Sequence, residues 1–355
     1  MRRFHGRGQH EIPLHWIFAL VGGALFLLFF FILIRSVTTQ HEEKSGRDLA
    51  FAVETIVTTA AATPDTFTVT DLQDAKYAFA CERDAASFLS YVFVEGAAKQ
   101  AKAQLDTENL RYVPVFSPSS VSGDQLFTST RAWEAPFPVG SLVLLSNNRT
   151  RYVLVGDTRL IKSFVEEENL GGFDILRKGR DAFKDVKDEG LDQYRFVFFN
   201  TGFQLPPQEF LGKRNGALVV HTDDNGETGT LDFYDNLRLG ANAPSKKGVP
   251  FAGRALLDAA IFSQDSNSFD CNMLKARERL NTTITILQRR LEVLGNGSAL
   301  QLKCGPLFDE AKAALIAYSN SPDRAFAAAA AGSGPIILLS SINQRAFAAD
   351  CPSIY

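Results

Sequence analysis

The stretch LHWIFALVGGALFLLFFFILI, from Leu14 to Ile34, decides the layout of this chain. It contains no Asp, Glu, Lys or Arg, and 15 of its 21 residues are Leu, Ile, Val or Phe. As a helix it spans roughly 32 Å at ~1.5 Å per residue, close to the ~30 Å hydrocarbon core of a bilayer. Its apolar side chains contribute roughly −5 to −9 kcal/mol to the free energy of inserting the helix into a membrane. The stretch therefore predicts a transmembrane helix, with the lipid bilayer as the partner of residues 14–34.

The flanks of this stretch predict that the helix is kept as an anchor. A cleaved secretory signal has about 7–15 apolar residues and a small-x-small cleavage site. The run here is longer and ends at Ile34 without such a site. Arg2, Arg3 and Arg7 precede it, and basic residues favour the cytoplasmic side. We therefore expect a single-pass protein of the cell membrane, with a cytoplasmic N-terminus and the bulk of the chain extracytoplasmic.

The dipeptide Gly8-Gln9, which follows Arg7, is a possible processing site. Prepilin-type signals place a basic residue and Gly directly before an apolar helix, which is then kept for filament assembly. In this respect the N-terminus resembles the class III (prepilin-like) signals of archaeal surface proteins. The tract HWIFALVGGALFLLFF also resembles the N-termini of uncharacterised archaeal single-pass membrane proteins. The likeness covers only this segment and implies no activity, and Pro13 stands where pilins commonly have Glu.

Composition indicates a packed domain beyond the anchor. The chain has 355 residues, 45% of them hydrophobic, and 29 are Phe. Such a content favours a folded core over disorder. The net charge is only −3, so the chain has no excess of positive charge that would attract nucleic acid. We therefore expect no nucleic-acid partner.

The four cysteines all follow the anchor: Cys81, Cys271, Cys304 and Cys351. None are spaced C-x-x-C, which argues against a zinc or thioredoxin-type site. An even count in an extracytoplasmic region predicts two disulfides, with three possible connectivities. We favour Cys271–Cys304 with Cys81–Cys351, although a long helix between Cys271 and Cys304 would separate that pair. Four buried thiols in a cytosolic domain are the alternative.

Three N-x-S/T sequons begin at Asn148, Asn281 and Asn296. Such motifs mark candidate glycosylation sites on surface segments of secreted proteins. They also arise by chance in a chain of this length. They are therefore candidates that fit an exposed, extracytoplasmic domain.

The pattern of the chain predicts an α/β fold in four parts. These are a tail and anchor (1–35), a stalk with an amphipathic helix (36–65), a mixed α/β domain (66–238) and a helical C-terminal region packed on it (252–355). The loop-rich segment 239–251 is the internal boundary. Two hairpins are expected, 141–145 with 151–155 and 217–222 with 228–234, because turn residues separate β-prone runs. The apolar run 194–200 is typical of a central strand.

Helices are predicted from apolar spacing of three and four residues. The clearest is a helix from about Asp270 that ends at Gly295. Others are expected over 47–62 and 173–186, after Pro306, and over 336–349. This helix has an apolar stripe formed by Leu280, Ile284, Leu287, Leu291 and Leu294. The stripe fits either packing on the chain's own sheet or binding to a partner helix, as in a short coiled coil.

Catalytic signatures are scarce. His221 is the one histidine beyond the N-terminal region, so any Ser-His-Asp or Cys-His arrangement must use it. Asp223 and Asp224 follow His221, and adjacent residues of a strand point to opposite faces. Their spacing therefore does not identify either of them as the partner of His221. The segment Asp223 to Glu227 departs from the calcium-loop pattern, which has oxygen ligands at positions one, three and five before Gly. Here Gly226 is already the fourth residue, so a turn is favoured over a metal site. We expect no cofactor and no metal site.

Three functions compete on this evidence. The first is a membrane-anchored extracytoplasmic binding or assembly protein of the cell surface, with a protein partner or self-assembly, including a pilin-like filament subunit. The second is a membrane-tethered hydrolase with an acidic site of unfamiliar pattern. The third is a cytoplasmic tethered scaffold with reduced thiols.

Overall fold

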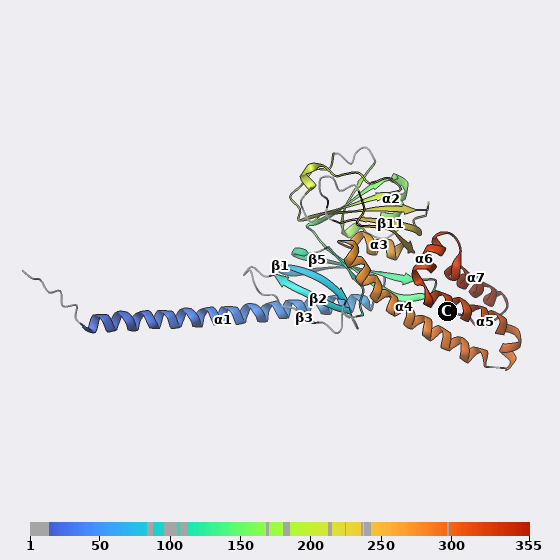
Figure 1. Ribbon diagram of the computed structural model, residues 1–355, viewed down its shortest axis with the longest axis horizontal. Coiled ribbons are helices and arrows are strands. Elements are labelled where there is room, and N and C mark those ends of the chain that lie inside the picture. Colours follow the sequence, from blue (N-terminus) through green and yellow to red (C-terminus); the bar gives the residue numbers. More distant parts are fainter. Residues whose placement is uncertain are drawn as a thin grey trace, which may run out of the picture.

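The structure is a computed structural model of the full chain, and it combines one long helix with two mixed sheets and a helical C-terminal part (Figure 1). It describes residues 14–83, 88–95, 105–106, 112–118, 120–167, 170–179, 185–211, 215–223, 225–235, 237, 243–296 and 298–355. The predicted α/β class is therefore confirmed. The possible processing site at Gly8 and Gln9 lies outside the described residues.

Helix α1 (Leu14–Ala61) is one uninterrupted helix of 48 residues. Its first part projects away from the rest of the molecule, and its last part lies against the first sheet (Figure 1). From the sequence it was open whether the helix expected over 47–62 continues the apolar helix as one rod; the structure has a single helix through both segments. The helix ends at Ala61, just before the Thr63-Pro64 step, where Pro disfavours a helical conformation at the residue before it.

The first sheet, sheet A, packs on the second half of α1. Its strand order is β3-β2-β1-β5-β6-β4, and all neighbours are antiparallel except β4 and β6. The bounds are β1 Phe67–Arg83, β2 Phe88–Glu95, β3 Leu105–Asp106, β4 Val115–Phe116, β5 Val121–Glu134 and β6 Pro138–Asn147. One face buries Ala50, Val53 and Val57 of α1. The other face contributes to the main core.

The second sheet, sheet B, is parallel at one side and antiparallel at the other. Its order is β12-β11-β10-β9-β7-β8, with β8, β7, β9 and β10 mutually parallel. The bounds are β7 Thr150–Gly156, β8 Asp174–Lys178, β9 Gln193–Phe199, β10 Gly216–Thr222, β11 Thr228–Tyr234 and β12 Lys246–Ala252. Helix α2 (Thr158–Glu167) connects β7 to β8 and completes a β-α-β unit.

Glycine is required where β7 ends. Gly156 has φ +141°, and a Cβ placed there would lie 2.3 Å from the carbonyl oxygen of Phe199 on β9. The close approach of these two strands therefore excludes any side chain at this position.

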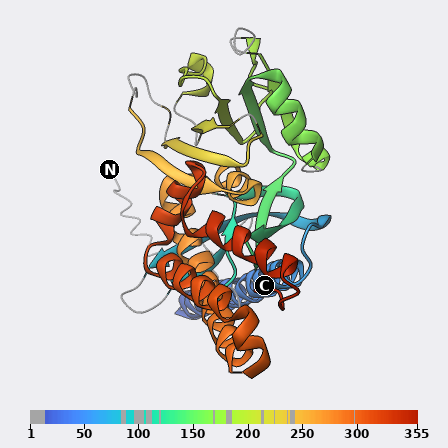
Figure 2. The same ribbon diagram turned by 90° about the vertical axis from the view of Figure 1, so that its right-hand side faces the viewer.

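The C-terminal helices pack on both sheets. Helix α3 (Arg254–Phe262) contacts β5 and β6 of sheet A and β12 of sheet B, so it lies between them. The other helices are α4 (Ser266–Gly295), α5 (Ser298–Asn320), α6 (Pro322–Ala330) and α7 (Gly334–Ala348). Seen from the side facing these helices, sheet B with α2 lies above and α1 runs away behind (Figure 2). One continuous core joins both sheets to α3–α7.

Several local predictions are confirmed. Helix α4 ends at Gly295 and buries Leu280, Ile284, Leu287 and Leu291 against the chain's own core. Strand β9 is buried along its whole length, between two parallel neighbours. Strands β10 and β11 form the predicted hairpin.

Four local predictions are wrong. Strands β6 and β7 do not form a hairpin, because β6 pairs in sheet A and β7 in sheet B, and the turn at Asn148 carries the chain between them. Residues 174–178 form strand β8, not a helix. Within the expected loop 239–251, residues 246–251 belong to strand β12, which pairs with β11. Pro306 lies inside α5, which begins eight residues earlier at Ser298.

Candidate functional site

The first candidate site is the projecting part of α1. The large apolar side chains between Val21 and Ile32 are 45% to 73% exposed. Residues 25–32 make more than two turns, so the apolar surface covers all sides of the helix. An apolar surface of this size on a protein requires lipid or a protein partner to cover it.

No single helix within the described residues is both long and apolar enough to span a membrane, and the apolar helix found in α1 covers only Val21–Ile32. A bent pair, Pro322–Ala329 with Gly334–Ala348, meets the criterion of length and composition together. Phe326 of α6 and Leu339 and Ile342 of α7 are buried in the main core.

The base of α1 is fixed to sheet A by packing and by polar contacts. Ala50, Val53 and Val57 are fully buried against it. Just beyond the helix, Thr130 donates its hydroxyl to the Thr63 carbonyl at 2.7 Å, and the Ala132 amide donates to the Asp65 carboxylate at 3.0 Å. The projecting segment is thereby attached to the domain through a rigid joint.

Two disulfides are present, as the even cysteine count predicts, but the favoured pairing is wrong. Cys81 of β1 is bonded to Cys271 of α4, and Cys304 of α5 is bonded to Cys351, with both Cα pairs 5.9 Å apart. From Cys271 to the end of α4, at Gly295, the chain rises roughly 36 Å. Cys304 follows that far end, so Cys271 cannot reach it. The ion pair of Arg345 with Glu310 shows that α7 runs back along α5, which brings Cys351 to Cys304.

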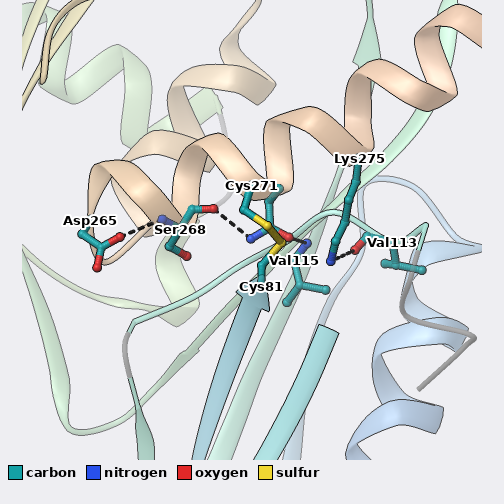
Figure 3. Close-up of a disulfide and its surroundings, with 8 residues drawn as sticks. Cys81, Val113, Val115, Asp265, Ser268, Cys271 and Lys275 are labelled. Carbon is teal, nitrogen blue, oxygen red and sulfur yellow. Dashed lines mark hydrogen bonds between the residues drawn. A yellow bond between two sulfur atoms is a disulfide. The ribbon is translucent and has the colours of Figure 1, made fainter. Parts of the chain in front are cut away.

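The Cys81–Cys271 disulfide lies beside a buried lysine (Figure 3). Lys275 follows Cys271 by four residues and so shares its face of α4. Its side chain is buried, and Nζ donates to the Val113 carbonyl at 3.4 Å. Burial, together with the nearby charge of Arg279, lowers the pKa of Lys275 from 10.5 to about 7. Lys275 was not predicted from the sequence, although its position four residues after Cys271 is a signal that could have placed it beside the disulfide.

The three sequon asparagines are all exposed. Asn148 lies in the turn between the two sheets, Asn281 on the outer face of α4, and Asn296 just after α4. Exposure is what glycosylation of these sites requires, and their occupancy stays a prediction.

His221 lies on β10 with its side chain 52% exposed. Its Nε2 is 3.4 Å from the carboxylate of Asp232 on β11, and the other oxygen of that carboxylate accepts from the Gly248 amide at 2.7 Å. The partner of His221 is thus an acid of the neighbouring strand, which spacing along one strand cannot reveal. Asp223 stabilises the β10–β11 turn, accepting from the Glu227 amide at 3.0 Å. Because all four cysteines are disulfide-bonded, no thiol is available as a nucleophile.

A cavity of about 490 Å³ between β5, α3 and α7 has carboxylates in its wall, which the hydrolase alternative needs. Asp65 accepts the Ala132 amide, and Glu227 lies 3.4 Å from the guanidinium of Arg254. Neither Asp65 nor the third acid, Glu134, forms an ion pair with the residues that the structure describes.

The described residues also contain no group of three or more His, Cys, Asp or Glu placed to hold a metal ion. Comparisons with models of protein families, with curated proteins and with solved structures each find no match to this chain.

Proposed function

We propose that this chain is a single-pass membrane protein whose α/β part lies outside the cytoplasm and binds or assembles at the cell surface. The observation that carries the proposal is the projecting half of α1, which exposes large apolar side chains on all sides and is not covered by any other part of the chain that the structure describes. Lipid around residues 14–34 would cover this surface, and the helical residues 35–47 would raise the domain about 20 Å above it.

The two disulfides support the extracytoplasmic placement. Disulfides persist in oxidising compartments and are rare in the cytosol. The exposed asparagines of the three sequons are compatible with the same placement. A pilin-like subunit is the narrower form of the proposal, because α1 couples an apolar first half to a second half packed on a sheet.

Arginine substitution within the apolar half of α1 tests the anchor. The double variant Leu28→Arg with Phe29→Arg is expected to leave the membrane pellet after an alkaline wash, whereas the unmodified chain stays. Each arginine near the helix centre costs about 2.5 to 3.5 kcal/mol on insertion, which removes most of the roughly 5 to 9 kcal/mol supplied by the apolar residues. The measurement is the fraction of protein in the pellet.

The matched control carries Ile286→Arg with Val293→Arg, two exposed positions on α4. This control is expected to remain in the pellet. Equal retention of both double variants would exclude the anchor.

Mass spectrometry of the protein from its native membranes, without reductant, tests placement and processing together. We expect the linked peptides Cys81–Cys271 and Cys304–Cys351 and glycans at Asn148, Asn281 or Asn296. Four free thiols with bare asparagines would favour the cytoplasmic scaffold instead. A mature N-terminus at Gln9 supports the pilin-like form, and an intact Met1 or Arg2 contradicts it.

A further inference from the structure

A second surface feature, on the domain and away from α1, is an open cavity of about 390 Å³. It lies between β12, the first half of α4 and the start of α6. Strand β12 is the edge of sheet B, so this cavity occupies a side of the sheet on which β12 has no neighbouring strand. Its volume is within the range of small-molecule sites, which is about 300–1,000 Å³.

The walls of the cavity are apolar and fixed. Leu256, Phe269, Met273 and Phe326 line it, and each is at least 95% buried in the main core. Side chains packed in this way hold their rotamers, so the cavity is formed before any ligand binds. An apolar group of one or two rings matches such a wall in size and polarity.

The rim of the cavity is charged, with an excess of cations. Lys246 pairs with Asp270, and Arg277 pairs with Asp323, so two of the three basic residues are neutralised. The third, Lys247, is exposed and has no ion-pair or hydrogen-bond partner among the described residues. Three cations against two carboxylates leave one positive charge at the mouth.

One further donor at this cavity is unsatisfied. The Nε of Arg277 is buried and has no hydrogen-bond partner among the residues that the structure describes. Because this atom is buried, a ligand in the open cavity does not reach it, and it adds nothing to the recognition of a ligand. The excess positive charge at the rim is what favours an anion.

We propose that this cavity binds a small amphipathic anion, with an aromatic body against Phe269, Met273 and Phe326 and a single carboxylate at Lys247. The apolar wall favours the aromatic part of the ligand, and the positively charged rim favours its carboxylate. The two features together match the usual design of a ligand site, in which apolar walls carry a few placed polar groups. This site goes beyond the anchoring function and depends only on the domain.

Calorimetric titration of the full chain in lipid nanodiscs with 2-naphthoate tests the proposal, with empty nanodiscs as the blank. We expect one saturable site per chain, and at least fivefold weaker binding of 2-naphthamide, which has the same rings without the charge. Raising the salt concentration is expected to weaken the binding of naphthoate and to leave that of naphthamide unchanged, because salt screens an exposed charge.

Variants separate the roles of the rim and the wall. Lys247→Glu is expected to weaken naphthoate binding at least fivefold and to spare naphthamide. The control Lys187→Glu, at another exposed lysine, is expected to change neither. Leu274→Trp, at a half-buried position of the wall, is expected to weaken both ligands without unfolding the core.

Three results would overturn the proposal. These are the absence of saturable naphthoate binding, equal affinity for naphthoate and naphthamide, and equal effects of Lys247→Glu and Lys187→Glu. None of them bears on the membrane anchor, so failure here leaves that proposal intact.

Discussion

Replacing Cys81 and Cys271 together by serine is expected to lower the free energy of unfolding by about 5 kcal/mol. This bridge closes a loop of 190 residues and joins β1 of sheet A to α4 of the C-terminal part. Removing it frees the unfolded chain to occupy many more conformations, which is the main way in which a disulfide stabilises. The measurement is urea unfolding of the full chain in nanodiscs, followed by the fluorescence of Trp133, which is buried.

The second bridge provides the comparison for this result. Replacing Cys304 and Cys351 opens a loop of 47 residues, for which the same chain-entropy estimate is about 4 kcal/mol. The first variant should therefore be the less stable of the two. Unchanged unfolding of the Cys81/Cys271 variant, or linked peptides that join Cys271 to Cys304, would contradict the pairing.

The variant Lys275→Met is expected to gain stability over the unmodified chain as the pH falls from 10 to 7. In the folded state the pKa of Lys275 is about 7, whereas the ordinary value is 10.5. Between these pH values the unfolded chain binds a proton that the folded chain does not, so stability rises with pH. Below pH 7 both states are protonated and the folded state carries the full cost of a buried charge. Methionine removes this cost.

The expected size follows from about 1.4 kcal/mol per pKa unit. The advantage of Lys275→Met over the unmodified chain should fall by about 2 kcal/mol between pH 7 and pH 9, because the folded amine is half protonated at pH 7, and it should be nearly constant below pH 6. Urea unfolding at pH 6, 7, 8 and 9 measures it. The control Lys187→Met, at an exposed position, should show no such trend. A pH-independent difference for Lys275→Met would show that the amine is charged in the fold throughout this range.

Elements with a strong local signal were predictable from the sequence. The stripe on α4 has a helical period, and Gly295 stops the helix. The β10–β11 hairpin has turn residues between two β-prone runs. Strand β9 is an uninterrupted apolar run, as a strand buried on both faces must be. In each case the determining contacts lie within one short segment.

Features that depend on distant partners were not predictable. The runs that became β6 and β7 look like a hairpin, because only two residues, Asn148 and Arg149, separate them. Each strand instead has better partners elsewhere: β5 and β4 for the first, and β8 and β9 for the second. The disulfide pairing failed for the same reason, since it depends on which ends of α4, α5 and α7 meet.

The proposed ligand cavity shows the same limit. Its wall comes from residues 246–250, 269–277 and 323–326 together with Leu256, and no local pattern connects these segments. Lys247 is an ordinary surface lysine until β12 is placed at the edge of sheet B and α4 and α6 are placed beside it. The apolar run 14–34, in contrast, is contiguous in the sequence, so the prediction of an anchor needed no knowledge of distant contacts.

The continuity of α1 has a mechanical consequence. Because the helix has no break between Leu14 and Ala61 and its base is packed into sheet A, it transmits torque from one end to the other. If residues 14–34 turn about the helix axis inside a bilayer or a bundle, the whole domain swings through the same angle. A neighbour that fixed the rotation of residues 14–34 about the helix axis would thereby also fix the direction in which the two sheets and the C-terminal helices face.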